Sequence, residues 1–271
     1  MRIAIEDDFD LGRIADSGQC FRWTRMDDGS YRILQGCESL RIRNLGGGVF
    51  DFGCTEEQFN RIWSGYFDLD ENYRAIRERV DSEVDQALWC ACECEKGIRI
   101  LRQDLWEVLV SFIISQNRNI PAIKRSIELL ADLAGPSRTD ALGCDYRGFP
   151  DAEAIARLSE RQLTQCALGY RAKYVLAAAR AVSSGEFNRE ALAAADDEEA
   201  VARLCELYGV GVKVASCVAL FGLHRLDAFP QDVWIKRILA SEYPDGYPFD
   251  LYSPYNGVYQ QYLFAYFRNG G

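Results

Sequence analysis

The spacing of apolar residues changes near residue 55, and this change limits the folds open to the chain. Before that point the segments YRILQG, SLRIRNL and GVFDFG are short, Gly-punctuated and alternate between apolar and polar residues. In the second of them, Leu40 and Ile42 would face a core while Arg41 and Arg43 face water, as in an antiparallel strand with one solvated side. From TEEQFNRIWSGYF onward, helical spacing dominates. The sequence therefore predicts an α+β fold, with an antiparallel β-meander followed by a mostly helical body.

Local signals fix where some of these helices begin. Thr55 with Gln58 and Ser159 with Gln162 have the spacing of capping boxes, in which two side chains satisfy backbone groups reciprocally. The Ala-rich segment RAKYVLAAARAV predicts a strong helix that ends at SSG. No internal repeat or low-complexity linker interrupts the pattern.

Length and composition limit the class of protein. The chain has 271 residues, of which 48% are hydrophobic, enough for a substantial core. No apolar run reaches the roughly 18 residues of a membrane span, and the start MRIAIEDDFD is acidic, unlike a signal peptide. We therefore expect a cytoplasmic protein without a membrane partner.

Cysteine and histidine content limits the chemistry. Ten cysteines without a secretory signal indicate reduced thiols, most of them small buried apolar residues. Cys90, Cys92 and Cys94 stand at alternate positions, too close for the usual spacing of a zinc chelate, and His224 is the only histidine. We expect no metal and no cofactor.

The net charge of −10 argues at first against a nucleic-acid partner. Most of the acidity lies before residue 96, however, and basic residues outnumber acidic ones between residues 96 and 128. A modest basic face and an ordinary solvated helix surface both fit this stretch.

The segment LYGVGVKVASC, residues 207 to 217, places two glycines where a helix would begin. Glycines suit a tight turn from Tyr208 to Gly211 because they need no Cβ clearance. The backbone N–H groups of a helix starting near Val212 would then be free to hold an anion such as a DNA phosphate, without a net positive protein. Taken alone, the segment also fits a surface turn followed by a solvated Lys213.

Nineteen residues after Lys213, the segment FPQDVWIKRIL places Asp232 where a helix N-cap belongs. G-V-G-x-K followed by P-x-D-V resembles the hairpin-helix-hairpin motif of DNA glycosylases that carry a lysine nucleophile. SGQCFRW, GIRILRQDLWEVLVSFIISQNRNI, DYRGFP, LGYRAKYV and YNGVYQQYLF resemble, in order, blocks of the 8-oxoguanine DNA glycosylases. The resemblance runs from Ser17 to Phe267.

This resemblance implies a twisted antiparallel sheet domain with flanking helices, residues 1–95, and a helical domain of two subdomains, residues 96–271, with the DNA-reading cleft between the subdomains. The hairpin-helix-hairpin would occupy residues 204–222. The implied activity is that of a bifunctional glycosylase and AP lyase that removes 8-oxoguanine from duplex DNA. We expect the protein to be DNA-associated and monomeric.

The resemblance also implies the roles of the catalytic residues. Lys213 would attack C1′ of the damaged nucleotide, expel the base and form a Schiff base, from which β-elimination cuts the strand. Asp232 would stabilise the positive charge that develops on the sugar.

In the resembled family, the extruded base lies between a cysteine and a phenylalanine, which correspond to Cys217 and Phe264. The amide of Gln260 would meet the Watson–Crick edge of the base, and the carbonyl of Gly18 would accept the N7 hydrogen that only the oxidised guanine carries. Phe264 follows Gln260 by four positions, as Cys217 follows Lys213, so each pair shares a helix face. Without the resemblance, Cys217 and Phe264 fit a packed core equally well.

The block SQNRNI resembles the loop that enters the duplex where the base has left it. Asn117 would fill the gap and read the orphaned cytosine, while Tyr170 and Arg171 match a wedge and a second cytosine contact. Gly209 and Gly211 would approach the DNA backbone at the hairpin.

Three positions depart from the family pattern. Ala122 stands where strict members have another cytosine-reading arginine, Arg118 where an asparagine is expected, and Trp234 where some relatives have histidine. An alanine cannot donate a hydrogen bond to the cytosine edge. We therefore expect weak rather than strict selectivity for cytosine opposite the lesion.

Two alternatives remain open. The first is a relative that acts on another lesion, although oxidised-pyrimidine enzymes carry an iron–sulfur cysteine cluster after the catalytic aspartate, whereas the last cysteine here is Cys217. Alkylpurine and adenine relatives generally lack the lysine. The second is a non-catalytic DNA-binding module, which could use the same hairpin without Lys213 or the pair Gln260 and Phe264.

Overall fold

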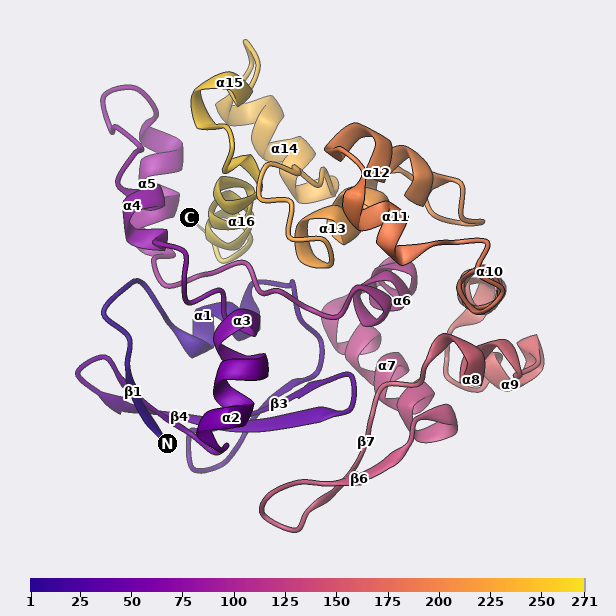
Figure 1. Cartoon of the computed structure of the whole chain (residues 1–271). Coiled ribbons are helices and arrows are strands. Elements are labelled where there is room, and N and C mark those ends of the chain that lie inside the picture. Colours follow the sequence, from indigo (N-terminus) through magenta and orange to yellow (C-terminus); the bar gives the residue numbers. More distant parts are fainter. Residues whose placement is uncertain (271) are drawn as a thin grey trace.

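A five-stranded antiparallel sheet forms the N-terminal part of the chain (Figure 1). In the computed structural model, which describes residues 1–270, the strand order is β1-β5-β4-β3-β2. The strands are β1 Arg2–Ala4, β2 Trp23–Arg25, β3 Tyr31–Gln35, β4 Glu38–Gly46 and β5 Val49–Phe52. The predicted alternation in β4 is confirmed, because Leu40 and Ile42 are buried while Arg43 is exposed on the other side.

Helices cover the buried face of this sheet. They are α1 (Leu11–Asp16) and a continuous stretch composed of α2 (Glu56–Gln58), the π-helical η1 (Phe59–Trp63) and α3 (Ser64–Tyr66). The stretch begins with the predicted capping box of Thr55 and Gln58. Phe52 and Trp63 are fully buried in the core between sheet and helices, so the sheet has a hydrophobic core of its own.

Helices make up most of the remaining described chain. Their bounds are α4 Tyr73–Arg77, α5 Gln86–Cys94, α6 Leu105–Ser115, α7 Ile120–Ala134, α8 Ala152–Ala156, α9 Glu160–Thr164, the 3-10 helix η2 Gly169–Arg171, α10 Ala172–Ser183, α11 Arg189–Ala194, α12 Asp197–Cys205, α13 Val212–Phe221, α14 Val233–Glu242, α15 Phe249–Tyr252 and α16 Asn256–Arg268. The second predicted capping box, Ser159 with Gln162, begins α9. None of the helices within residues 1–270 has the length and apolarity required to cross a membrane.

One hairpin, which the sequence did not indicate, interrupts this part of the chain, and the prediction of a mostly helical body is confirmed. Strands β6 (Ser137–Thr139) and β7 (Asp145–Arg147) pair antiparallel and project from the body (Figure 1). Each strand is only three residues long and largely exposed, so its sequence carries no apolar alternation that would reveal it.

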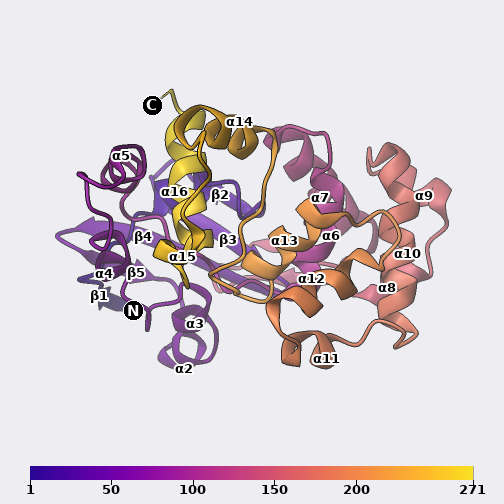
Figure 2. The same cartoon turned by 90° about the horizontal axis from the view of Figure 1, so that it is seen from above.

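The helical body is organised around α6, which is buried along nearly its whole length. Helix α13 packs on α6 and α12, and α16 packs on α5 and α14 (Figure 2). Helices α4 and α5 contribute to the core of the helical body, so the two hydrophobic cores separate near residue 70. This separation of the cores does not define a domain boundary, so the boundary expected at residue 95 stays a prediction.

Buried Arg99 ties the N-terminal segment to the helical body. Its guanidinium donates to Asp7 Oδ2 at 2.7 Å and to the carbonyls of Phe67 and Glu71 at 3.0 and 2.7 Å, and it stacks over the ring of Tyr73. A fully buried charge is tolerated only when it is paired and hydrogen-bonded in this way. The carbonyl of Arg99 in turn accepts a 2.8 Å hydrogen bond from Gln19, beside a segment of the candidate site.

His224 lies in a second polar connection between the two parts. Its Nε2 is 3.0 Å from Asp68 Oδ2, while Arg102 donates to Oδ1 of the same carboxylate at 2.7 Å. Burial opposes ionisation of Asp68, but these hydrogen bonds outweigh burial and lower the pKa of its carboxyl. The only histidine thus has a structural role, through its polar contact with Asp68.

Candidate active site

Two adjoining cavities share Lys213 and Asp232 as part of their walls. The outer cavity has a volume of about 450 Å³ and is also lined by Gly211 and by residues 115–118. The inner cavity, of about 60 Å³, is lined by the pocket residues expected from the sequence: Gly18, Cys217, Gln260 and Phe264. The two catalytic candidates therefore lie at the junction between a large cleft and a small pocket.

The hairpin before Lys213 forms as predicted. Val210 donates to the carbonyl of Leu207 to close the turn, and α13 begins at Val212. Gly209 has a φ of +86°, and a Cβ there would lie 2.2 Å from Cγ of Tyr174, so only glycine fits. Gly211 is the N-cap and offers no side chain, which leaves N–H groups of the first turn without an intrahelical partner.

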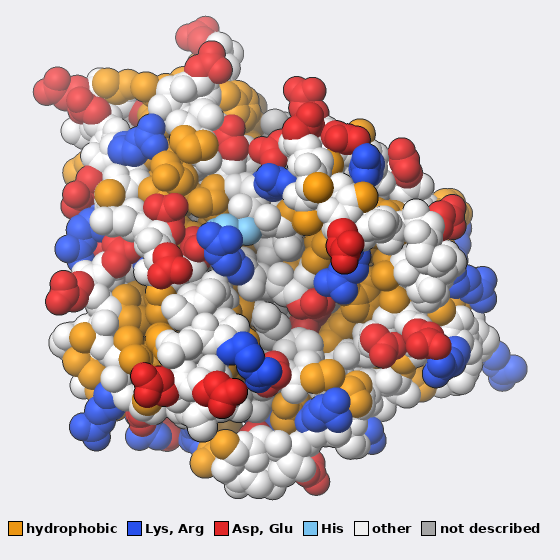
Figure 3. All heavy atoms as spheres, viewed as in Figure 1, with side chains coloured by type: hydrophobic (Ala, Val, Ile, Leu, Met, Phe, Trp, Pro, Cys, Tyr) orange, Lys and Arg blue, Asp and Glu red, His pale blue; other side chains and the backbone are white. Residues whose placement is uncertain are grey.

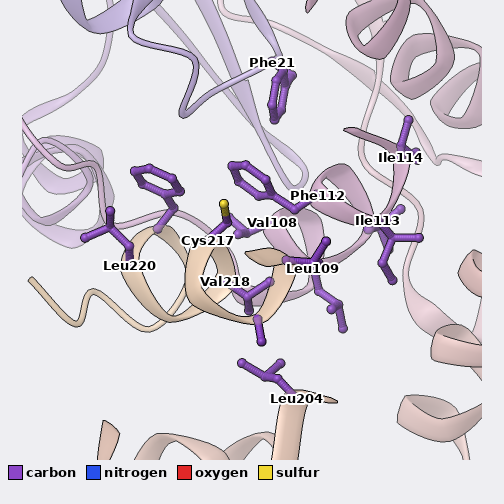
Figure 4. Close-up of a cluster of buried hydrophobic side chains, with 14 of the residues drawn as sticks. Phe21, Val108, Leu109, Phe112, Ile113, Ile114, Leu204, Cys217, Val218 and Leu220 are labelled. Carbon is purple, nitrogen blue, oxygen red and sulfur yellow. The ribbon is translucent and has the colours of Figure 1, made fainter. Parts of the chain in front are cut away.

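Lys213 lies in the first turn of α13, half-buried between apolar groups. Its Nζ is 5.4 Å from the centroid of the Phe112 ring, which comes from α6. One turn further along α13, Cys217 is buried beside Phe112 (Figure 4). Burial raises the pKa of the Cys217 thiol to about 11, partly offset by the nearby Lys213, so this side chain is a neutral thiol at neutral pH.

Asp232 is the predicted N-cap of α14. Its Oδ1 accepts a 2.8 Å hydrogen bond from the backbone N–H of Ile235. This contact fixes the carboxylate at the edge of both cavities.

Ser17 and Gly18 form one wall of the inner cavity, and hydrogen bonds hold the chain on both sides of Gly18. Ser17 donates to the carbonyl of Ile14, and Gln19 exchanges hydrogen bonds of 2.8 Å with the backbone of Arg99 and Leu101. Gly18 between them has a φ of +81°, and a Cβ there would meet Cε1 of Phe264 at 3.2 Å. A rigid backbone wall therefore faces the Phe264 ring.

Helix α16 supplies the opposite wall through Gln260 and Phe264, one turn apart as predicted. Arg268, a further turn along, lies over the Phe264 ring at 5.0 Å and donates to the carbonyl of Asp16. In this state the inner cavity has room for a few water molecules and not for a purine. Entry of a base therefore requires the ring or its neighbours to move.

Sequence reasoning missed Gln261, which lines the inner cavity beside Gln260 and is 4% exposed. Two adjacent glutamines in the otherwise apolar and aromatic segment VYQQYLF were the available signal. It also missed Phe112, whose apolar helix α6 reads as ordinary core.

The residues expected to read the opposite strand come together at one edge of the outer cavity. Asn117 is exposed, has a φ of +52° that asparagine tolerates, and donates to the hydroxyl of Tyr170 at 3.1 Å. Arg171 is 7% exposed, and its Nε donates to the carbonyl of Gln116 at 2.7 Å. Burial, with a smaller contribution from nearby Arg118, lowers the pKa of Arg171. The guanidinium of Arg171 is thus buried against the backbone of Gln116. Its contact with cytosine stays a prediction.

Gln116 connects this edge to the hairpin. Its carbonyl accepts from Arg171, and its Nε2 donates to the carbonyl of Gly209 at 3.1 Å. Beside it, the rings of Tyr170, Tyr174 and Tyr208 form two successive edge-to-face pairs with centroids 5.8 and 5.0 Å apart. The loop at residues 116–118 and the hairpin at residues 207–211 are thus joined through Gln116.

The departures noted in the sequence also have defined places. Ala122 lies in the first turn of α7. Its backbone N–H donates to Oδ1 of the N-cap residue Asn119 at 3.0 Å. Arg118, in the loop before α7, donates to Ser126 Oγ on that helix at 2.7 Å. Trp234 is 42% exposed on α14 with Arg237 over its ring, two positions after Asp232.

Charge around the outer cavity is positive although the whole chain is acidic. Arg118, Lys213 and Lys236 line this cavity with Asp232 as its carboxylate. Over the face shown in Figure 3, acidic and basic side chains are interspersed and form no continuous basic patch. Attraction of an anion is therefore local to the cleft, where backbone N–H groups add to the side-chain cations.

Two family models match consecutive parts of the chain. Residues 2–109 match the model for the N-terminal domain of 8-oxoguanine DNA glycosylase, and residues 110–243 match the HhH-GPD superfamily of base excision DNA repair proteins. An N-glycosylase/DNA lyase of Saccharomyces cerevisiae is 35% identical over 86% of this chain. The chain spans 68% of the length of that protein and 64% of an Arabidopsis thaliana N-glycosylase/DNA lyase OGG1 to which it is 28% identical.

Solved structures agree with these matches over the whole fold. The structure of MBOgg1 in complex with a low affinity DNA ligand is 39% identical, with a TM-score of 0.93 over 99% of this chain and 95% of that chain. A Clostridium acetobutylicum 8-oxoguanine glycosylase/lyase, in complex with double-stranded DNA containing cytosine opposite 8-oxoG, is 33% identical. Its TM-score is 0.89, with 99% of this chain and 98% of that chain covered.

Proposed function

The chain belongs to the 8-oxoguanine DNA glycosylase/lyase family of the hairpin-helix-hairpin superfamily, and from this we propose that it excises 8-oxoguanine from duplex DNA and cuts the strand at the resulting site. One observation supports the assignment of Lys213 and Asp232 as the catalytic residues. Lys213 and Asp232 lie at the junction of the cavity that would admit the sugar-phosphate backbone and the pocket that would admit the base. The bond between sugar and base would cross that junction.

In this mechanism the neutral amine of Lys213 attacks C1′, and the bond between C1′ and N9 breaks with its electron pair leaving on the base, which takes up a proton. Nζ loses a proton to give an aminal, the C1′–O4′ bond then breaks with its electron pair leaving on O4′, which takes up a proton, and a protonated Schiff base forms between Nζ and C1′. Loss of a proton from C2′ then expels the 3′ phosphate by β-elimination, and water releases the lysine. Asp232 stabilises the positive charge on the sugar as the base departs.

Base recognition in this proposal uses the inner pocket. Phe264 and Cys217 hold the two faces of the extruded base, Gln260 meets its Watson–Crick edge, and the Gly18 carbonyl accepts the N7 hydrogen. The fixed backbone of Ser17–Gln19 suits this last role, because a carbonyl that cannot shift can discriminate by one hydrogen bond.

Duplex binding uses the outer cavity and its edge. Backbone N–H groups after Gly209 and Gly211 hold phosphate, while Asn117, Tyr170 and Arg171 occupy the gap left by the base. A cytoplasmic, DNA-associated monomer that needs no metal or cofactor remains part of this proposal.

Borohydride trapping on a duplex with a single 8-oxoguanine tests it directly, because borohydride reduces the Schiff base to a stable secondary amine. The expected result is a covalent protein–DNA adduct that Lys213→Gln does not form. Release of another lesion in preference, from matched duplexes with an oxidised pyrimidine or alkylated purine, would overturn the substrate assignment. Binding without any adduct or base release would favour the non-catalytic DNA-binding module.

A further inference from the structure

Gln260 and Gln261 are adjacent on α16, and both side chains are buried, at 3% and 4% exposure. Each amide carries a donor end and an acceptor end, so burial has a large free-energy cost unless the ends meet suitable partners. Both residues line the inner cavity, together with Pro230 from the segment that leads to Asp232.

A relay of two hydrogen bonds sets the orientation of both amides. The carbonyl of Pro230 can only accept, and it takes a 3.1 Å hydrogen bond from Gln260 Nε2. Gln260 Oε1 is therefore turned toward Gln261, whose Nε2 donates to it at 2.9 Å. A flipped Gln260 amide would place two acceptors together at Pro230 and two donors together at Gln261.

The relay leaves defined groups for a ligand. Gln260 retains one N–H on Nε2 and one lone pair on Oε1, while Gln261 Oε1 has no hydrogen-bond partner within residues 1–270. The Watson–Crick edge of a guanine-type base presents N1–H and a 2-amino group as donors and O6 as an acceptor. A fixed amide with one free donor and one free acceptor is complementary to that mixed edge.

We propose that Gln261 is a positioning residue for lesion recognition, which locks the Gln260 amide in the orientation that a guanine-type edge requires. The proposal rests on the proposed excision of 8-oxoguanine and adds a residue whose own side chain need not touch the base. Because the relay starts at the Pro230 carbonyl, it also ties the base-reading amide to the turn that carries Asp232.

The test compares two reactions of the full-length protein. Base excision from an 8-oxoguanine duplex needs the pocket, whereas strand cleavage at a preformed abasic site uses Lys213 without any base. Gln261→Met keeps the side-chain length and removes the donor. We expect its single-turnover excision rate to fall by about tenfold, with cleavage at the abasic site within about twofold of wild type.

Gln261→Glu keeps the size and shape of the side chain but changes its ability to donate a hydrogen bond to Gln260 Oε1. Its ionised carboxylate cannot donate to Gln260 Oε1, whereas the protonated form can. The excision defect of this variant relative to wild type at the same pH should therefore shrink as the pH is lowered. Burial of the charge alone would impair abasic-site cleavage with the same pH dependence, so both reactions are measured across the pH range and only excision should show the recovery.

Two further variants calibrate the assay. Phe264→Ala removes the stacking ring and should show the same pattern of lost excision with retained abasic-site cleavage. Gln86→Met removes a glutamine that donates to Cys90 on α5, away from both cavities, and should leave both reactions unchanged.

The outcomes distinguish the two proposals. If wild type releases no 8-oxoguanine, the proposed function is wrong. If wild type releases it and Gln261→Met excises within about twofold of wild type, or loses both reactions equally, the relay is wrong. Selective loss of excision in Gln261→Met, with pH-dependent recovery in Gln261→Glu, supports it.

Discussion

Helices α13 and α14 both begin at the outer cavity, but their N-termini are built in opposite ways. α13 starts at Gly211, which provides no side chain, whereas α14 starts at Asp232, whose carboxylate accepts from Ile235. A glycine N-cap costs only a few tenths of a kcal/mol relative to a good capping residue. For this small cost the first helix keeps backbone donors free for an external anion, and the second holds a carboxylate in place. In the proposed function the cleft would therefore bind an anion through backbone donors and hold a fixed negative charge on a side chain, and Lys213 lines the same cavity.

The largest effect should come from the lysine in the first turn of α13. Lys213→Gln should lower single-turnover base release at least about a thousandfold, because no other group in the mechanism forms the covalent bond to C1′. Binding to a lesion-containing duplex should stay within about tenfold of wild type, since the backbone donors and the strand-reading loop do not involve the amine. Gel shift and single-turnover assays on one preparation measure both. Equal loss of binding and excision would contradict the division between the two helix starts.

Asp232 combines capping with charge, and two substitutions separate these roles. Asp232→Asn keeps a side-chain oxygen that can accept from Ile235 but removes the charge, so we expect a loss of excision of about a hundredfold with little change in thermal stability. Asp232→Ala should lose excision similarly and also lower the free energy of unfolding by about 1 kcal/mol. Denaturant melts beside excision assays distinguish them. An Asp232→Asn variant as active as wild type would show that Asp232 serves only as the N-cap of α14 and that its charge has no role in excision.

A third helix start, that of α7, tests selectivity for the opposite base. Asn119 caps α7, and Ala122 in its first turn has no donor to offer to cytosine. We expect 8-oxoguanine opposite C, T, G and A to be excised with modest preference for C, and Ala122→Arg to raise the C-over-A ratio about tenfold. Single-turnover rates on the four duplexes measure this. A steep ratio in wild type would mean that another cation, such as Arg118 or Lys124, reads the cytosine.

The smallest effect should come from capping α13 itself. A side chain at Gly211 meets no atom within 4 Å, so Gly211→Ser and Gly211→Asp are sterically free. Both should stabilise the protein by a few tenths of a kcal/mol, while Gly211→Asp weakens DNA binding about fivefold through repulsion of phosphate and loss of free N–H donors. Melting temperatures and binding isotherms should therefore move in opposite directions. Unchanged DNA affinity in Gly211→Asp would exclude this helix start as a phosphate site.

Features that depend on short stretches of chain could be predicted from the sequence. The alternation of β4, the capping boxes at Thr55 and Ser159, the turn before Val212 and the N-cap at Asp232 each arise from residues within a few positions of one another. Their backbone geometry is set by local sterics and local hydrogen bonds, so the residue pattern predicts each feature without knowledge of the tertiary structure.

Contacts between distant segments could not be predicted. The pairing of β1 with β5 joins residues 2–4 to residues 49–51, and β1 itself is too short to carry a period. The buried position of Arg171 follows from where the Gln116 carbonyl lies, 55 residues away in sequence. The role of Gln261 likewise depends on the carbonyl of Pro230, which no spacing rule connects to it.

The contacts of Gln116 also bear on how the site opens. Its backbone and side chain join residues 116–117 to two other segments, 168–171 and 207–211, and both of these lose a hydrogen-bond partner if residues 116–117 unfold locally. We infer that these segments form one cooperative unit in the native ensemble, whose amides exchange hydrogen with a common free energy of opening rather than singly. During lesion search, residues 116–117, 168–171 and 207–211 would then move together. Binding of phosphate at the hairpin would thereby change the position of Asn117 and Tyr170 at the base stack.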